Sequence, residues 1–237
     1  MRVPFLLFTL LLIPAGGVFA ESRSEKLGDR LLKLEEIFYE GFDKGLQSWS
    51  IEGDAAVGVH EGWLEVDARE GKVAAATIWC RREFEGSQVV EYDVRLLGHS
   101  IQSNVNMFLL ASIPDGPGIL ESGGERDGRY NQYHSFPNYL VTILNGVSPE
   151  KREMLRVRLR LDPGFKLASE SWSEPLVFGK VYHVAYLIEP PDLTVYLDGQ
   201  EIGKAAYETK LERGLHGLRI WHTHSIYDNF RVSRVAE

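Results

Sequence analysis

The 237-residue sequence contains one cysteine, Cys80, so the chain cannot form an internal disulfide. We expect Cys80 to be a small buried hydrophobe in a strand, because free cysteine is among the most buried residue types. Beyond the first twenty residues, no segment approaches the ~20 apolar residues that a membrane helix needs. Basic residues are fewer than acidic ones, and the net charge of −8 disfavours long-range attraction to nucleic acid. We therefore expect neither a nucleic-acid nor a membrane partner.

The N-terminus has the pattern of a cleavable secretory signal. Arg2 precedes an apolar run over residues 5–14, and small residues lead to Ala20. The apolar run is too short to span a bilayer. We therefore predict a signal peptide over residues 1–20 and a secreted or periplasmic protein.

Most of the remaining chain alternates between apolar and polar residues, which is typical of half-buried strands. Strands are predicted over residues 63–67, 89–97, 105–111, 139–144, 155–161, 182–188 and 193–197. Turn residues separate them, so we predict an all-β jelly-roll sandwich of two antiparallel sheets over residues 37–237. The spacing of Leu27, Leu31 and Leu34 predicts a short helical lead-in over residues 21–36. We expect a monomer without an organic cofactor.

Polar residues recur on single faces of several predicted strands. Asn104 and Asn106 share one face, as do Arg219 and Trp221, since side chains alternate along a strand. A third face carries Arg156, Arg158 and Arg160. Buried amide or guanidinium groups need partners, so we expect these faces to form a binding groove. The long segment 113–137 is predicted to supply a mobile lid in its first half and an aromatic groove wall in its second.

Four segments carry a resemblance to a known family. They are WCRREFEGSQVVEYDVRLL, NQYHSFPNYLVTILNG, RLRLDPG and LRIWHTHSIYDNFRV. They resemble the YesU-like family of uncharacterised proteins, and the likeness covers roughly residues 38–232. It implies a concanavalin A-like jelly roll and a link to the breakdown of pectins such as rhamnogalacturonan. The implied partner is an acidic polysaccharide or oligosaccharide.

Such a substrate suggests a polysaccharide lyase. A uronate-cleaving β-eliminase needs a base, an acid and a cation that neutralises the substrate carboxylate. The residues expected to supply this chemistry are Tyr133, His134, His224 and Arg156. The residues expected to bind the substrate are Asn104, Asn106, Tyr130, Arg158, Arg219, Trp221 and His222. In a regular strand Trp221 and the two histidines that follow it cannot all face one groove, so a bulge is required.

Two other functions remain open. Glu65, Asp67 and Glu70 match the E-x-D-x-x-E signature of laminarinase-like glycoside hydrolases, and retaining hydrolysis uses two carboxylates. The second alternative is a non-catalytic glycan-binding module that presents the same groove.

A structural calcium site is also predicted. In many related jelly rolls, acidic groups at the first and last strands hold calcium together with backbone carbonyls. Glu40 and Asp228 occupy such positions here, and hard oxygen ligands suit calcium.

Overall fold

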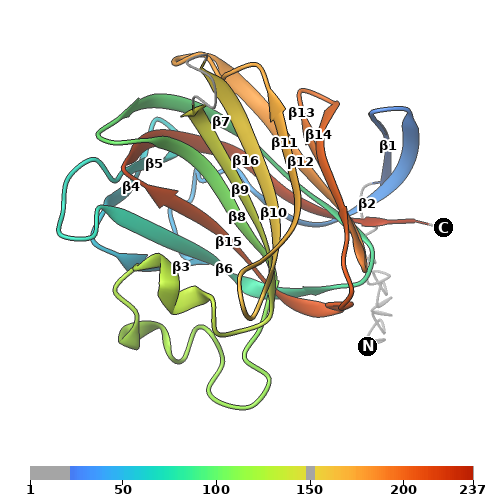
Figure 1. Ribbon diagram of the computed structural model, residues 1–237, viewed down its shortest axis with the longest axis horizontal. Helices are drawn as coiled ribbons and strands as arrows, with labels where there is room; N and C mark the ends of the chain where they lie inside the picture. The colour runs from blue at the N-terminus through green and yellow to red at the C-terminus, as the bar shows by residue number, and fades with distance from the viewer. Residues whose placement is uncertain (1–21, 148–152, 237) are drawn as a thin grey trace, which may run out of the picture.

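The computed structural model describes residues 22–147 and 153–236, which form a sandwich of two antiparallel sheets (Figure 1). The nine-stranded sheet has the order β1-β2-β16-β7-β12-β13-β14, and β5 joins β16 and β4. Its strands are β1 (Ser22–Leu27), β2 (Arg30–Glu40), β4 (Ala56–His60), β5 (Trp63–Asp67), β7 (Gln88–His99), β12 (Val181–Glu189), β13 (Asp192–Leu197), β14 (Gln200–Ala206) and β16 (Thr223–Val235). The predicted all-β sandwich of two antiparallel sheets is confirmed.

The seven-stranded sheet has the order β11-β10-β9-β8-β15-β6-β3. Its strands are β3 (Trp49–Gly53), β6 (Ala75–Glu85), β8 (Ser103–Ala111), β9 (Asn138–Val147), β10 (Met154–Asp162), β11 (Lys166–Ser173) and β15 (Arg213–Trp221). Alternation along each strand sends one set of side chains into the core between the sheets. In β10, Leu155, Val157 and Leu159 point inward, so Arg156 and Arg158 lie on the outer face.

Cys80 is fully buried in the core between the sheets, as predicted. Burial raises the pKa of its thiol to about 12, because the thiolate would lose its hydration there. The thiol therefore stays protonated at neutral pH and contributes as a packed apolar group.

The predicted N-terminal helix is wrong, because the described part of this segment is a β-hairpin. β1 and β2 pair through a turn at Gly28, whose φ of +57° suits glycine. Leu31 is 74% exposed, whereas Leu32 and Leu34 are buried, so the leucines follow a strand period and not a helical one. Pairing of β2 with β16 supplies the backbone partners that favour the strand. The predicted signal peptide lies outside the described residues.

Residues 112–137 connect β8 to β9 and lie over the outer face of the seven-stranded sheet (Figure 1). The segment contains two 3₁₀ turns, Gly123–Glu125 and Tyr130–Tyr133. The segment is not a free lid, because its middle is tied to β3 by a bidentate ion pair from Arg126 to Glu52, at 2.6 and 2.8 Å. Both side chains are buried, and such a pair is strongly destabilising to break.

No helix within the described residues is long and apolar enough to cross a membrane.

Candidate functional site

A pocket of about 750 Å³ lies between the outer face of the seven-stranded sheet and residues 112–137. Its floor consists of Asn106, Thr142, Leu144, Arg158, Arg219 and Trp221. The connecting segment supplies one wall, formed by Arg129, Tyr130, Asn131 and His134. Lys72, Val73, Ile101 and Gln102 complete the lining. Six of the eleven predicted catalytic or substrate-binding residues therefore meet here: Asn106, Tyr130, His134, Arg158, Arg219 and Trp221.

Strand register creates the polar floor. Arg219 on β15 lies opposite Asn106 on β8, Asn106 lies opposite Thr142 on β9, and Thr142 lies opposite Arg158 on β10. Neighbouring strands are ~4.8 Å apart, so this row of four side chains extends over about 14 Å. It places a guanidinium toward each end and two neutral hydrogen-bonding groups between them.

Arg219 is buried without a counter-ion in the described structure. It is 2% exposed and donates to the backbone oxygens of Ile220, at 2.5 Å, and Gly128, at 2.9 Å. Its guanidinium lies 5.4 Å from the centre of the Tyr130 ring, and its Nε has no hydrogen-bond partner. Burial lowers the pKa of the guanidinium, which reports the free-energy cost of keeping this cation out of water. An anion in the pocket would offset that cost.

The other charged groups of the lining have the same sign. Lys72, Arg129 and Arg158 line the pocket with Arg219, and no Asp or Glu among the described residues does so. Arg129 is paired with Asp127, but Arg158 has no hydrogen bond or ion pair to a described residue, and its Nε is buried. Burial and the neighbouring Arg160 and Arg156 lower the pKa of Arg158. The pocket is therefore cationic.

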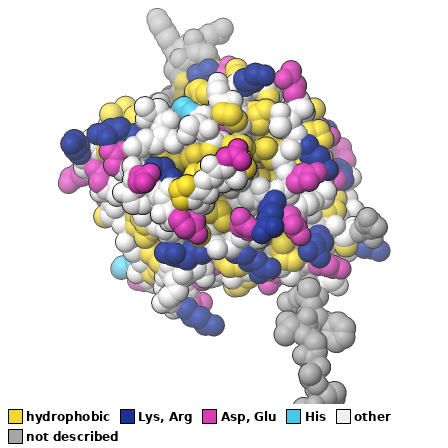
Figure 2. Space-filling view, turned by 90° about the horizontal axis from the view of Figure 1, so that it is seen from below, with side chains coloured by type: hydrophobic (Ala, Val, Ile, Leu, Met, Phe, Trp, Pro, Cys, Tyr) yellow, Lys and Arg dark blue, Asp and Glu magenta, His cyan; other side chains and the backbone are white. Residues whose placement is uncertain are grey.

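This charge is local to the pocket. The chain as a whole carries −8, and the side of the molecule seen in Figure 2 has basic and acidic side chains interspersed. Attraction of an anion must therefore arise from the uncompensated groups inside the pocket and not from a broad positive surface.

Two titratable side chains of the wall lie against each other. The rings of Tyr130 and His134 meet edge to face at 4.6 Å, and the Tyr130 hydroxyl is 3.2 Å from Thr142 Oγ1. His134 also stacks on Phe165 at 4.1 Å. Burial and the neighbouring cations Arg160 and Arg219 lower the pKa of His134, so its imidazole is neutral at pH 7 and can accept a proton. Burial raises the pKa of Tyr130, so its hydroxyl remains a proton donor.

Tyr133 and Arg156 do not line the pocket, which corrects the predicted catalytic set. Tyr133 is fully buried against Trp79 and Phe108, and its hydroxyl donates to Glu52 at 2.8 Å. It anchors the connecting segment and cannot contact a ligand. Arg156 forms an ion pair with Glu170, at 2.5 Å, so its charge is already compensated.

His224 lies on the nine-stranded sheet, away from the pocket. Its Nε2 is 2.7 Å from a carboxylate oxygen of Glu65 on β5. Because Leu64 and Val66 of β5 point into the core, Glu65 faces outward on the opposite side of the sandwich. The predicted catalytic role of His224 is therefore inconsistent with its position.

Glu65 and Asp67 of the hydrolase motif lie on β5 and face that same side, and Glu70 lies in the loop that follows β5. Asp67 forms two hydrogen bonds with the Arg69 guanidinium, which holds the pKa of its carboxyl at about 2. None of the three carboxylates of this motif lines the pocket.

The backbone conformation of His222 explains why Trp221 and His224 lie on different sheets. It has a φ of +51° at the junction where the chain passes from β15 to β16, and therefore from one sheet to the other. Its Nδ1 is 2.9 Å from Ser100 Oγ, and its ring meets the Trp221 ring at 4.4 Å. It borders the pocket through Trp221 without lining it.

Asn104 holds two lining residues in position through hydrogen bonds. Its Oδ1 accepts hydrogen bonds from Asn106 Nδ2, at 3.0 Å, and from the Trp221 backbone N–H, at 3.2 Å. Its Nδ2 donates to Thr223 Oγ1 at 3.1 Å. Because Asn104 is buried and fully engaged, it supports the site and does not contact a ligand, contrary to the prediction.

Each of the two predicted calcium ligands accepts a hydrogen bond from the backbone N–H of a nearby residue. Glu40 accepts a hydrogen bond from the Phe42 N–H at 3.1 Å, and Asp228 accepts one from the Asn229 N–H at 2.7 Å. A calcium site at Glu40 and Asp228 stays a prediction.

Several lining residues were not predicted from the sequence. Thr142 could have been found, because it is a polar residue on the outward face of a strand otherwise rich in leucine, isoleucine and valine. Lys72 and Arg129 lie outside the strands, where no periodicity indicates the direction of a side chain.

The fold matches several solved structures. A Bacillus subtilis protein of unknown function with a galectin-like fold has a TM-score of 0.71 and 17% identity, covering 90% of this chain and 100% of that one. An endo-β-1,3-glucanase from Pyrococcus furiosus has a TM-score of 0.60 and 11% identity, covering 90% and 98%. The carbohydrate-binding module CBM66 from Bacillus subtilis has a TM-score of 0.51 and 15% identity, covering 79% and 96%. At these identities the likeness shows the fold alone.

No curated protein matches the sequence. A family described as a domain of unknown function, DUF6250, matches residues 71–230, which include every residue that lines the pocket. Because this match spans more than half of the chain, the protein belongs to the DUF6250 family.

Proposed function

We propose that the pocket binds an acidic sugar unit of a polysaccharide, such as a uronate of pectin or rhamnogalacturonan. The observation that carries this proposal is the presence of two uncompensated guanidiniums, Arg158 and Arg219, in a pocket without a described carboxylate. Guanidinium forks match the geometry of carboxylates, and charge-assisted hydrogen bonds are roughly twice as strong as neutral ones.

The remaining lining suits a sugar ring. Trp221 and Tyr130 supply apolar faces, while Asn106 and Thr142 supply polar groups between the two cations. This mixture of aromatic walls and a few placed polar groups is typical of small-molecule sites. By their names, the glucanase acts on a β-1,3-glucan and the CBM66 module binds carbohydrate, so the fold supports a glycan ligand by analogy.

The test compares two ligands that differ in the charge of the carboxyl group and in the methyl group that removes it. Binding of an oligogalacturonide and of its fully methyl-esterified form is measured by calorimetry with the purified protein. The acid should bind at least ~10-fold more tightly, because only the acid supplies a carboxylate for a charge-assisted hydrogen bond worth 1.5–3 kcal/mol. Equal affinities would show that charge is not recognised, and absence of binding to any acidic glycan would overturn the proposal.

A second candidate function is β-elimination in the same pocket, because His134 and Tyr130 lie together in its wall. In this reaction neutral His134 takes the proton from C5 of the uronate, and the C4–O bond breaks. A double bond forms between C4 and C5, and Tyr130 donates its proton to the leaving oxygen. Arg158 would neutralise the substrate carboxylate and make the C5 proton acidic. Retaining hydrolysis is less well supported, since it needs two carboxylates about 5–5.5 Å apart.

Turnover is tested by following the ultraviolet absorbance of an unsaturated uronate during incubation with pectic polymers. His134→Gln should abolish the signal while oligogalacturonide binding persists. His222→Gln is the matched control, because His222 borders the pocket without lining it, and it should retain turnover. If the unmodified protein binds the polymer but produces no absorbance, the protein is a binding module and the elimination is refuted.

A further inference from the structure

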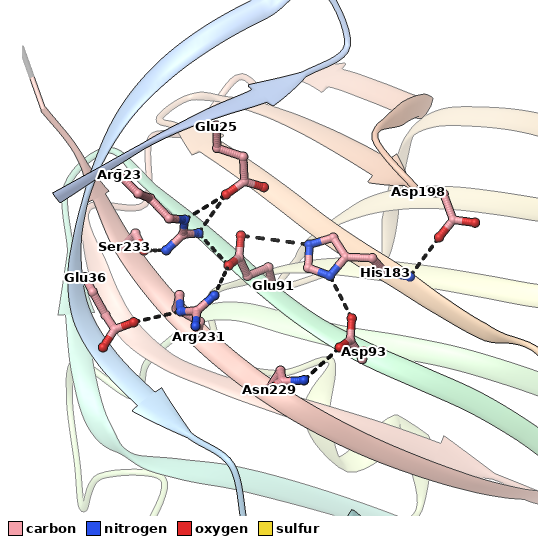
Figure 3. Close-up of polar contacts among 10 residues, drawn as sticks. All are labelled: Arg23, Glu25, Glu36, Glu91, Asp93, His183, Asp198, Asn229, Arg231 and Ser233. Atoms are coloured by element: carbon pink, nitrogen blue, oxygen red, sulfur yellow. Dashed lines mark hydrogen bonds and ion pairs between the residues drawn. The ribbon is translucent and has the colours of Figure 1, made fainter. Parts of the chain in front are cut away.

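A second group of charged residues lies on the outer face of the nine-stranded sheet, under the β1–β2 hairpin (Figure 3). Glu25 comes from β1, Glu91 from β7 and His183 from β12. One potential metal-ligand atom of each lies within 4.8 Å of the other two. Residues far apart in the sequence therefore converge at one point.

In both Glu25 and Glu91, one carboxylate oxygen accepts hydrogen bonds from arginine and the other does not. Glu25 Oε2 accepts hydrogen bonds from Arg23 at 3.0 and 2.8 Å. Glu91 Oε1 accepts hydrogen bonds from Arg23, at 2.5 Å, and Arg231, at 3.1 Å. The other oxygen of Glu91 is buried without a hydrogen-bond partner and lies 4.0 Å from His183 Nε2. A buried carboxylate oxygen in this state destabilises the fold unless something binds it.

His183 is held in the orientation that metal-binding histidines adopt. Its Nδ1 is 2.8 Å from Asp93 Oδ1, and Asp93 Oδ2 accepts a hydrogen bond from Asn229 Nδ2 at 2.8 Å. A carboxylate at one ring nitrogen fixes the tautomer and directs the other nitrogen toward the metal. Here the other nitrogen, Nε2, is directed toward Glu91 (Figure 3).

The charges of this network do not balance. Four carboxylates, from Glu25, Glu36, Glu91 and Asp93, face the two guanidiniums of Arg23 and Arg231. In the form that binds a metal, His183 is neutral, and these groups then carry a net charge of −2. One divalent cation would neutralise it.

We propose that Glu25, Glu91 and His183 bind a divalent transition-metal ion, with zinc as the best-matched species. Carboxylate oxygens and imidazole nitrogens are both zinc ligands, and three protein ligands leave the fourth tetrahedral position for a water molecule. Calcium and magnesium prefer all-oxygen sites, which disfavours both. Tetrahedral zinc ligands lie about 3.3 Å apart. The 4.0 Å between His183 Nε2 and Glu91 Oε2 must therefore shorten by less than about 1 Å, and the distances to Glu25, which are within 4.8 Å, by no more than about 1.5 Å. The ion would fasten the N-terminal hairpin to the sheet.

The experiment uses the purified protein without a polyhistidine tag, freed of metal with a chelator. Zinc chloride is titrated by calorimetry, and cobalt(II) is added separately to record the visible spectrum of the site. We expect one zinc ion per chain, tetrahedral cobalt bands and a rise in melting temperature with zinc. His183→Gln and Glu25→Gln should each weaken zinc binding by at least ~10-fold. His60→Gln, at an exposed histidine on β4, is the matched control and should bind normally.

Glu25 is included because its side chain is partly exposed, so Glu25→Gln leaves the fold intact even where a change at buried Glu91 would disturb it. Absence of a stoichiometric zinc site in the folded protein would overturn the proposal and indicate that a protonated His183 bridges Glu91 and Asp93 instead. Zinc binding that is unchanged in His183→Gln and Glu25→Gln would place the ion elsewhere and would overturn it equally.

Discussion

Replacing Arg158 with methionine separates the stability of the protein from its binding function. The Arg158 side chain makes no hydrogen bond or ion pair with a described residue, and its Nε is buried without a partner. Methionine retains much of the apolar stem that packs on the sheet, so little packing is lost. The substitution should therefore leave the free energy of unfolding unchanged or raise it.

The size of the gain follows from the neighbouring charges. Arg160 lies two residues along the same strand face, about 7 Å away. Two like charges at that distance repel by about 0.6 kcal/mol in water and about 2.4 kcal/mol at an effective dielectric constant of 20. Arg156 is equally near, but Glu170 compensates its charge. We expect Arg158→Met to raise the free energy of unfolding by ~1 kcal/mol, which is ~2–4 °C in melting temperature.

The same change should weaken the binding of acidic oligosaccharides. A hydrogen bond to a charged group contributes about 1.5–3 kcal/mol, so affinity should fall by about 10- to 100-fold. Urea unfolding at pH 7 measures the first effect, and calorimetry with an oligogalacturonide measures the second. Arg156→Met is the control, because it removes a neighbouring arginine that does not line the pocket, and it should change affinity by less than ~3-fold.

Two results would refute this reasoning. A loss of more than ~1 kcal/mol of stability in Arg158→Met would mean that the guanidinium is satisfied in the folded protein. Unchanged affinity for the acidic ligand, together with normal folding, would mean that this cation does not contact the anion. In either case the charge of the pocket would not be evidence for its function.

Three further predictions concern stability. Burial lowers the pKa of His216 to about 3 in the folded protein, whereas the imidazole of the unfolded chain has a pKa of about 6.5. As the pH falls below ~6.5, only the unfolded state binds a proton at His216. The free energy of unfolding should therefore decline by up to ~1.4 kcal/mol per pH unit. Urea unfolding at pH 7, 6 and 5 should show a shallower decline for His216→Asn, and parallel curves would contradict the assignment. Gly128→Ala should lower the melting temperature, because Gly128 has a φ of +88° and its added Cβ would lie 2.8 Å from Gly53 Cα; an unchanged melting temperature would contradict this. Tyr133→Phe should reduce stability by ~1–3 kcal/mol through loss of the hydrogen bond to Glu52, with oligogalacturonide affinity preserved; a large loss of affinity would return Tyr133 to the site.

Much of the pocket floor could be predicted because side-chain direction in a strand depends only on parity. Asn106, Arg158 and Arg219 are each flanked by apolar residues that had to face the core, so their own outward direction followed. The pairing of their strands into a single row was not predictable, since register depends on the long-range hydrogen bonding of β8, β9, β10 and β15.

The errors have physical causes of two kinds. Tyr130 and Tyr133 lie in a connection without a regular period. Nothing in the sequence therefore showed that Tyr130 would face the pocket and that Tyr133 would be buried between this connection and the outer face of the seven-stranded sheet. His224 was misplaced because the chain changes sheet at His222, where a residue other than glycine adopts a positive φ. The leucines of the N-terminal segment fit two periods, and pairing with β16 decided between them.

The pocket and the proposed metal site share one physical property, although they lie on opposite outer faces of the sandwich. Arg219 is a buried cation and Glu91 a buried anion, and each keeps an atom without a hydrogen-bond partner. Glu91 is paired through Oε1 with Arg23 and Arg231, so only its Oε2 lacks a partner, whereas Arg219 has no counter-ion among the described residues. Proteins are only about 5–15 kcal/mol more stable than their unfolded states, so a buried charge or charged oxygen left without a partner takes up a sizeable fraction of that margin. A chain with no internal disulfide has no covalent crosslink to offset the loss. The simplest account of both groups is that a ligand of opposite charge completes each site, an acidic sugar at Arg219 and a divalent cation at Glu91.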